Sequence, residues 1–346
     1  MVCGDLPAER DYMNIRKQKE REEINRLSEY AFKVVDTKGR KRSITPCEIR
    51  TDFERDRDRI IHSKSFRRLK HKTQVFISPE TDHNRTRLTH TLEVSQISRS
   101  IARALKVNED LTEAIALGHD LGHTPFGHSG EQVLNEICPF EFRHNIQSVR
   151  VVERIENDGR GLNLTHEVID GIKNHCHGFK PSTLEGEIVF FSDKIAYINH
   201  DIDDAVRFGV LKEEDIPGIF TEVLGNTNSQ RINTMIMDII KNSLHKDKIK
   251  MSDEIYKATM GLRKFLFENV YHSKMAIEEG NKGKAIVKRL YDYYTKHPEK
   301  MPTDFYKRVE SDGLSRSVCD YVACMSDIFA INTYKVLFIP NTIWGM

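Results

Sequence analysis

The sequence predicts an all-α protein. Apolar residues recur at helical spacing along almost all of the 346 residues, and no apolar–polar alternation lasts long enough to indicate a sheet. Charged side chains make up 30% of the chain and hydrophobic ones 38%, as expected for amphipathic helices around a core. No repeat, low-complexity tract or Pro/Gly/Ser-rich linker divides the chain, so we expect one large helical domain over 1–346.

The predicted helices can be placed along the chain. The charged segments 8–35 and 50–70 are expected to be helical, with a basic loop at 38–42 between them. A longer helix is predicted from Arg87 to about Leu105. Asn108 then has the side chain of an N-cap for the next helix, which we expect to stop at Gly122. Further helices are expected at 129–137, 142–157, 165–175 and 184–207, and the last third ends in an apolar run over 318–338.

Charge and cysteine content narrow the classes of protein. The formal net charge is +1, so no global field draws the chain to nucleic acid or to an anionic membrane. No stretch has the apolar length that spans a bilayer, and residues 1–10 lack the apolar run of a secretory signal. The six cysteines form no C-x-x-C pair. We therefore expect a reduced, cytoplasmic protein without a membrane partner.

The segment GHDLGHTPFGHSGE, residues 118–131, contains the first candidate metal ligands. His119 followed directly by Asp120 offers two ligands for one divalent ion at a helix end. The dipeptide alone carries little weight, because it recurs at residues 200–201. Glycines on both sides of the first pair leave room for a metal or substrate to approach the backbone, which favours the first pair.

Two further ligands are expected from separate helices. His90 lies near the start of the helix predicted at Arg87, and Asp193 lies on the helix predicted at 184–207. Taken singly, His90 would be read as a core or capping histidine and Asp193 as an exposed carboxylate. Facing helices of a bundle build metal sites from such side chains, so the set of four predicts a divalent metal site.

Two other histidine-containing segments have competing interpretations. His128 and Glu131 are three residues apart and share a helix face, where the carboxylate can fix the imidazole for general acid–base catalysis. A capping arrangement after Gly127 explains the same pair equally well. Residues 175–177, His-Cys-His, have zinc-like chemistry, but no second pair follows at zinc-finger spacing. We expect these three residues to be structural, at a helix end.

The ordered segments RLTHTLEV, ALGHDLGHTPFGHSGE, FRHNIQSVR and FSDKIAYINHDIDD resemble the HD-domain deoxynucleoside triphosphate triphosphohydrolases, the dGTPase family. The resemblance spans roughly 50–205 and returns at 316–329, which implies a metal and catalytic core at about 50–205 and a helical extension at about 206–346. It implies an all-helical enzyme that cuts deoxynucleoside triphosphates, dGTP among them, at the α-phosphate to a deoxynucleoside and tripolyphosphate. The expected cofactor is a divalent ion, Mn²⁺ or Mg²⁺, with Fe, Ni or Zn as further options.

The resemblance also implies roles for individual residues. His128 would transfer the proton at the ester oxygen, with Glu131 orienting it. The implied metal ligands are His90, His119, Asp120 and Asp193. The implied substrate contacts are Gln74 and Val75 at the deoxyribose, and Arg87, His144, Lys194, Tyr197 and Asp201 at phosphate and sugar. For the contacts on the helix over 184–207 a solvated helix face is the alternative, and for His144 a capping or core position. Cys324 stands where the family pattern leads us to expect glycine.

Family members commonly form tetramers or hexamers, and some are gated by a nucleotide or by single-stranded DNA, so the resemblance implies a homo-oligomer with such an effector. Two other functions compete. One keeps the HD metal site for another nucleotide: a monophosphate, a cyclic nucleotide or a ppGpp-like alarmone. The second is a non-catalytic nucleotide- or nucleic-acid-binding protein that uses the basic segments 40–42 and 67–72. The extra His128–Glu131 pair argues against the first, and the intact ligand set argues against the second.

Overall fold

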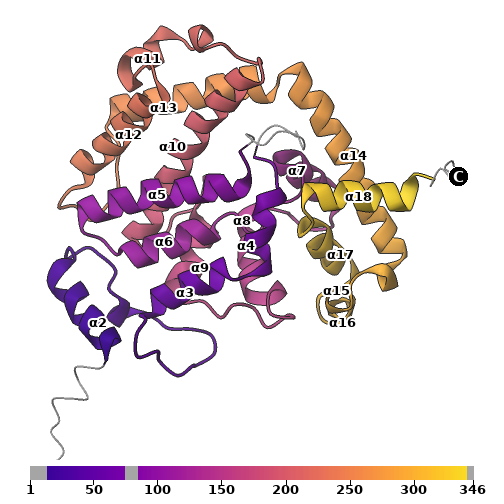
Figure 1. Ribbon diagram of the computed structural model, residues 1–346, viewed down its shortest axis with the longest axis horizontal. Helices are drawn as coiled ribbons and strands as arrows, with labels where there is room; N and C mark the ends of the chain where they lie inside the picture. Colours follow the sequence, from indigo (N-terminus) through magenta and orange to yellow (C-terminus); the bar gives the residue numbers. More distant parts are fainter. Residues whose placement is uncertain (1–13, 75–84, 341–346) are drawn as a thin grey trace, which may run out of the picture.

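The computed structural model describes residues 14–74 and 85–340, and within these ranges the prediction of an all-α protein is confirmed (Figure 1). Extended pairing there is limited to two isolated bridges, between Arg40 and Thr165 and between Thr73 and Thr86. Among the helices of these ranges, none is long and apolar enough to cross a membrane.

The N-terminal helices are shorter than predicted. Helix α2 (Ile15–Arg26) ends well before residue 35, where the sequence predicted its end. The chain after it forms a loop and then a 3₁₀ turn (Val34–Asp36). The buried Glu23 carboxylate accepts the backbone N–H of Val34, which fixes this return of the chain. The predicted helix at 50–70 is divided into α3 (Asp52–Ile61) and α4 (Lys64–Arg68), because Ser63 caps the second helix by accepting the N–H of Phe66.

Three helices form the centre of the protein: α5 (Arg87–Leu105), α6 (Glu109–Gly118) and α10 (Leu184–Arg207). They pack against one another, with α3 on α6 and α12 on α5 and α10. The predicted bounds of α5 and the N-cap at Asn108 are confirmed, since the Asn108 side chain accepts the N–H of Leu111. Helix α6 ends at Gly118 rather than Gly122, so the His119–Asp120 pair lies in the following turn. Fully buried side chains between these helices include Ile97, Ile101, Leu111, Ile115, Ile188 and Ile195.

The remaining helices surround this centre (Figure 1). Their bounds are α7 (Gly127–Ile137), α8 (His144–Arg150) with a π-helical turn (Val151–Ile155), α9 (His166–Asn174), α11 (Gly218–Leu224), α12 (Asn228–Ser243), α13 (Asp253–Leu266) with a π-helical turn (Phe267–Tyr271), α14 (Lys274–Lys296), α15 (Thr303–Tyr306), α16 (Arg308–Asp312), α17 (Leu314–Ala323) and α18 (Asp327–Phe338). The apolar run over 318–338 thus forms two helices, because Ser326 caps α18 by accepting the N–H of Phe329.

Helix α14 joins the C-terminal helices to the centre. It packs against α7 and against α17 and α18, and Figure 1 shows it descending beside them. Two of its glycines allow the close approach to α7: a Cβ at Gly283 would lie 2.8 Å from the Phe126 ring, and one at Gly280 would lie 2.7 Å from the Ser129 hydroxyl. The chain around residues 126–131 is therefore enclosed by a helix from the last third of the sequence.

The turn after α6 lies directly against the first turn of α8. A Cβ at Gly122 would lie 2.1 Å from the backbone nitrogen of Ser148 and 2.5 Å from the carbonyl oxygen of His144. The Gly122 N–H donates to the Ser148 hydroxyl at 2.8 Å, and that hydroxyl donates to the carbonyl of His119 at 2.7 Å. Only glycine allows this contact, which fixes the His119–Asp120 turn relative to α8.

We expect Gly122→Ala to destabilise the protein by about 1–3 kcal/mol, because its methyl group would overlap backbone atoms that cannot rotate away. Denaturant unfolding measures the change. The matched control is Gly218→Ala at the start of α11, where the nearest atom to an added Cβ lies 3.7 Å away and stability should change by no more than about 0.5 kcal/mol. Equal stability of the two variants would contradict the close contact.

Candidate metal and catalytic site

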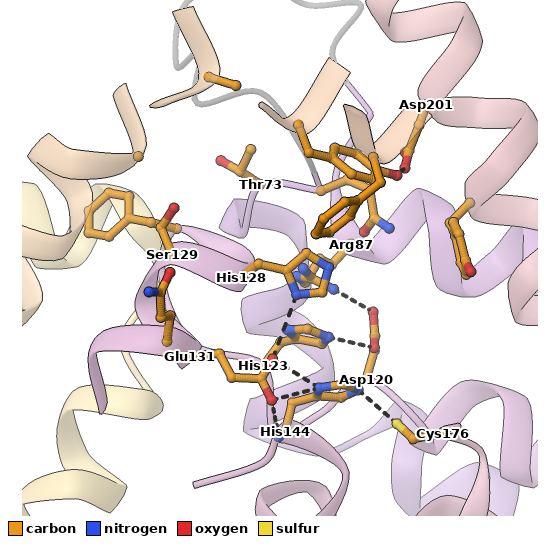
Figure 2. Close-up of a pocket in the computed structure, with 18 of the residues that line it drawn as sticks. Thr73, Arg87, Asp120, His123, His128, Ser129, Glu131, His144, Cys176 and Asp201 are labelled. Carbon is orange, nitrogen blue, oxygen red and sulfur yellow. Dashed lines mark hydrogen bonds and ion pairs between the residues drawn. The ribbon is translucent and has the colours of Figure 1, made fainter. Parts of the chain in front are cut away.

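A pocket of about 860 Å³ lies among α5, α7, α8, α10, α13 and α14, with the turn after α6 in its wall. Its volume suits a small-molecule ligand of nucleotide size. Histidines, carboxylates and Arg87 from segments far apart in sequence converge there, as Figure 2 shows, and Lys194 and Lys284 also line the pocket. The pocket therefore contains both acid–base groups and cations that can bind phosphate.

The structure brings the four predicted metal ligands together. His90 of α5 places Nε2 3.1 Å from Oδ1 of Asp193 on α10. His119 places Nε2 3.4 Å from Oδ1 of Asp120 and 3.8 Å from Oδ1 of Asp193. His90, His119 and Asp120 are buried, and Asp193 is partly accessible from the pocket.

The protonation of His119 fits a metal ligand. Its Nδ1 lies 2.6 Å from the carbonyl oxygen of Ala116, so Nδ1 carries the proton and donates it there. Its Nε2 is buried and has no hydrogen-bond partner among the described residues. Burial lowers the pKa of His119 to about 4, so the ring stays neutral. A backbone carbonyl that fixes the tautomer while a buried lone pair faces two carboxylates is the usual support of a metal-binding histidine. The residues present therefore fit a divalent ion.

Asp120 is also held by two groups on its other side. Arg87 donates from NH1 to Oδ2 at 2.9 Å, and His123 lies with Nε2 3.2 Å from Oδ1 (Figure 2). Burial, and then the nearby charge of Arg87, holds the pKa of His123 well below its usual value, so His123 is neutral. We did not single out His123 from the sequence, although its position four residues after His119 within the motif was an available signal.

The Glu131 carboxylate lies closer to His144 than to His128. Its carboxylate accepts the backbone N–H of His144 at 2.7 Å and the Nδ1–H at 3.0 Å, whereas Nδ1 of His128 lies 3.7 Å away (Figure 2). The His128 side chain is 78% exposed. Burial opposes the charged form of His144, but the Glu131 carboxylate raises the pKa of His144 well above its usual value. His144 is thus a partly buried cation, stacked on neutral His123 with ring centroids 4.0 Å apart.

The predicted contacts on α10 line the pocket beside the metal ligands. Lys194 lies with Nζ 2.9 Å from the centroid of the Phe190 ring, and burial lowers the pKa of Lys194 to about 8. The Tyr197 hydroxyl accepts the Nε–H of Arg263 at 2.7 Å. These groups face the same pocket as Arg87, so the cations and the metal ligands can act on one substrate.

The wall of the pocket also contains a hydrogen-bonded acidic pair. The Asp201 carboxylate accepts a hydrogen bond from the Tyr271 hydroxyl, and burial raises the pKa of Asp201 to about 7. Gln74 also lines the pocket, and its Oε1 is buried without a hydrogen-bond partner among the described residues. Val75, the other predicted sugar contact, lies outside the described residues. Arg263 and Tyr271 were not predicted, because no recognisable motif marks residues 206–315.

Comparison with known proteins gives two family matches, an HD domain over residues 87–198 and a phosphohydrolase-associated domain over 249–336. A deoxyguanosinetriphosphate triphosphohydrolase-like protein of Caldanaerobacter subterraneus subsp. tengcongensis is 59% identical over 329 residues, 95% of this chain and 97% of that protein. The chain belongs to this dGTPase-like family. Proteins of the same description are 49% identical in Clostridium tetani (96% of this chain, 99% of that protein) and 39% identical in Bordetella pertussis (91% and 97%).

The matched ranges divide the pocket of this dGTPase-like chain in two. The four predicted metal ligands all lie within the HD match, and Arg263 and Tyr271 lie within the phosphohydrolase-associated match. HD domains bind divalent metals, in agreement with the His/Asp cluster. Among solved structures, a hypothetical protein from Aquifex aeolicus aligns over 82% of this chain and 71% of its own, with a TM-score of 0.48 and 20% identity.

We expect His119→Ala to lose the divalent ion, because the buried Nε2 lone pair has no substitute nearby. In thermal unfolding, Mn²⁺ at 100 times its dissociation constant should stabilise the unaltered protein by about 2.7 kcal/mol and leave the variant unchanged. His62→Ala serves as the control, since His62 is exposed at the end of α3 and outside the pocket. An unchanged response to Mn²⁺ in His119→Ala would rule out this ligand set.

Proposed function

We propose that this protein hydrolyses deoxynucleoside triphosphates, dGTP among them, to a deoxynucleoside and tripolyphosphate. The observation that carries the proposal is a single pocket lined by three of the four HD ligands (His90, Asp120 and Asp193), the Glu131–His144 pair and the Lys194 cation, with His119 directly behind its wall. The names of the relatives, which describe dGTP triphosphohydrolase-like proteins, support the same substrate class.

Binding of the triphosphate is assigned to the cations of the pocket. Arg87 at Asp120 and the partly buried His144 cation lie beside the metal ligands, where the α-phosphate would be bound. Lys194 and Arg263 also line the pocket and would contact the remaining phosphates. Fixed cations at these points stabilise the negative charge that builds up on the oxygens of the α-phosphate in the transition state.

His128 is assigned the transfer of a proton to the 5′-oxygen as the ester bond breaks. Its ring lines the pocket, exposed to the substrate space, 6.0 Å from His123 between ring centroids. The Glu131 carboxylate lies 3.7 Å from Nδ1 of His128, where it can orient the ring while Nε2 faces the substrate. A divalent ion held by His90, His119, Asp120 and Asp193 would supply Lewis acidity at the α-phosphate and a water of lowered pKa.

The sugar is assigned to the Asp201–Tyr271 pair and to Gln74. The Tyr271 hydroxyl donates to the Asp201 carboxylate, and the buried Oε1 of Gln74 can accept a hydrogen bond from a hydroxyl group of the sugar. A 3′-hydroxyl bound between these groups would place the α-phosphate towards the metal ligands. Gln74 and Val75 together are the proposed basis for preferring a deoxyribose.

The bond that breaks can be identified by reaction in ¹⁸O-labelled water with each dNTP in Mn²⁺. Attack at the α-phosphate should place one ¹⁸O in tripolyphosphate and none in the deoxynucleoside, as measured by mass spectrometry of both products. His119→Ala should form neither product. Release of pyrophosphate or orthophosphate would instead indicate an HD enzyme for another nucleotide, and binding without turnover would indicate a non-catalytic protein.

Lys194 predicts a dependence of substrate capture on pH. Below its pKa of about 8 the amine is charged, and raising the pH through this value removes the charge. With Mg²⁺, kcat/KM should fall about tenfold as the amine is lost, the worth of one charged hydrogen bond. Lys194→Arg keeps its charge throughout and should show no fall from this group between pH 7 and 9. Parallel pH profiles for the two proteins would exclude Lys194 as the titrating group.

We also propose that the chain acts as one domain, since α14 of the C-terminal part packs against α7 and lines the same pocket as the metal ligands. Mn²⁺ or Mg²⁺ as the working metal, a tetramer or hexamer, a nucleotide or single-stranded DNA effector and a cytoplasmic location stay predictions. Light scattering with and without dNTP mixtures addresses the assembly and the effector together.

A further inference from the structure

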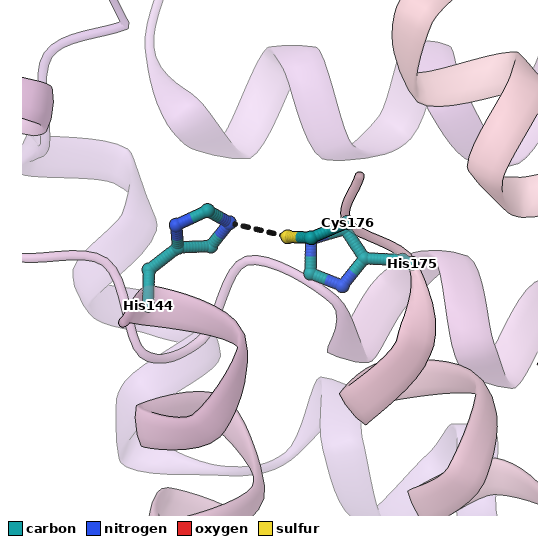
Figure 3. Close-up of side chains that lie close together, drawn as sticks. All are labelled: His144, His175 and Cys176. Carbon is teal, nitrogen blue, oxygen red and sulfur yellow. Dashed lines mark hydrogen bonds between the residues drawn. The ribbon is translucent and has the colours of Figure 1, made fainter. Parts of the chain in front are cut away.

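Cys176 and His175 lie at the pocket wall, and the proposed hydrolysis gives neither of them a role. Residues 175–177 were interpreted from the sequence as structural, because no second ligand pair follows at zinc-finger spacing. Packing of α8 against α9 supplies what the sequence lacks: it brings His144 to Cys176 across 31 intervening residues. Figure 3 shows the His144 imidazole directed at the Cys176 sulfur, with the His175 ring beside it.

The distances between the three groups resemble those of a metal site. Cys176 Sγ lies 3.2 Å from His144 Nε2 and 3.3 Å from His175 Nε2, and all three atoms lie within 4.8 Å of one another. Tetrahedral zinc with bonds of about 2.3 Å to sulfur and about 2.0–2.1 Å to nitrogen separates such ligand atoms by roughly 3.5 Å. Movements of less than about 1 Å would therefore be enough to enclose an ion.

Both histidines present the nitrogen that can bind a metal. His144 directs Nδ1 at the Glu131 carboxylate at 3.0 Å, and His175 directs Nδ1 at the carbonyl of Ile172 at 2.7 Å. Each Nδ1 can therefore keep its proton while Nε2 faces the sulfur. A carboxylate and a carbonyl behind the ring are the usual supports of a metal-binding histidine, and they orient both rings before any ion arrives.

The sulfur is also in a form suited to a metal. Burial opposes ionisation of Cys176, but the neighbouring charge of His175 and hydrogen bonds from both histidines lower the pKa of Cys176 to about 6. The thiolate is the form of cysteine that binds metals, and the two imidazoles that contact the sulfur are placed to support it.

We propose that His144, His175 and Cys176 form a second metal site, selective for Zn²⁺ and other thiophilic ions and distinct from the HD ligand set. Three protein ligands leave the fourth position open towards the pocket, where a water or a phosphate oxygen can bind. Thiolate favours such ions over Mn²⁺ and Mg²⁺, which prefer oxygen-rich sites. An ion there occupies Nε2 of His144, so on the proposed function it would displace a phosphate contact and inhibit the enzyme.

Cobalt distinguishes the two sites, because a Co²⁺–thiolate bond absorbs in the near ultraviolet and the nitrogen and oxygen ligands of the HD set do not. Titration of the full-length protein with Co²⁺ should produce this band at one equivalent per chain. The band should be lost in Cys176→Ser, which differs by one atom, and displaced by Zn²⁺. It should persist in His119→Ala, which lacks an HD ligand, and in Cys47→Ser, a control for the partly exposed thiol outside the pocket. No band in the unaltered protein, or a band that survives in Cys176→Ser, would overturn the site.

The inhibitory consequence has a separate measurement. Turnover is measured in excess Mn²⁺ with and without Zn²⁺. Zn²⁺ should reduce turnover at least tenfold in the unaltered protein and leave it nearly unchanged in Cys176→Ser. Equal inhibition of both proteins would show that zinc acts elsewhere, and would overturn the inhibitory role. The cobalt band does not depend on turnover, so loss of the proposed hydrolase function and loss of this metal site are distinguishable.

Discussion

The contact between the turn after α6 and the first turn of α8 determines where the histidines of the pocket lie. Gly122 allows two backbone segments to approach within van der Waals distance, and the Ser148 hydroxyl joins them by hydrogen bonds. His119, Asp120 and His123 project from one side of this contact and His144 from the other. The positions of His119, Asp120, His123 and His144 all depend on this close backbone contact. None of these side chains is long enough to compensate for a shifted backbone.

Burial then gives neighbouring histidines different charges. His119 and His123 are neutral, because desolvation outweighs the nearby carboxylates, whereas His144 is a cation, because Glu131 lies directly against it. A protein interior of low dielectric constant magnifies such differences. One carboxylate is therefore enough to give two stacked imidazoles different pKa values. The pocket thus offers a neutral ligand surface and a fixed positive charge within a few ångströms, without relying on the pH of the solvent.

Much of this arrangement was predictable from the sequence, for local reasons. The N-caps at Asn108 and the period of α5 depend on residues within one turn, and the H…HD…D order is written along the chain. The break at Ser63 and the early end of α2 were missed, because serine caps and returning loops compete with helical periodicity through contacts that only the fold creates. The pairing of Glu131 with His144 was missed for the same reason, since a neighbour three residues away was the visible candidate. Arg263, Tyr271 and the His144–Cys176 contact depend on distant segments packing together, which a single sequence does not reveal.

Most of the pocket is built from two parts of the chain that match two different family models. The reactive groups come from the segment that matches the HD domain, and Arg263, Tyr271 and the wall formed by α14 come from the segment that matches the phosphohydrolase-associated domain. Substitutions in the second segment can reshape the space around the nucleotide while the metal ligands and their hydrogen bonds stay in place. Such a division separates the residues that shape the space from those that carry the reactive groups, so changes along α13 and α14 can alter which ligands fit without moving the His/Asp cluster.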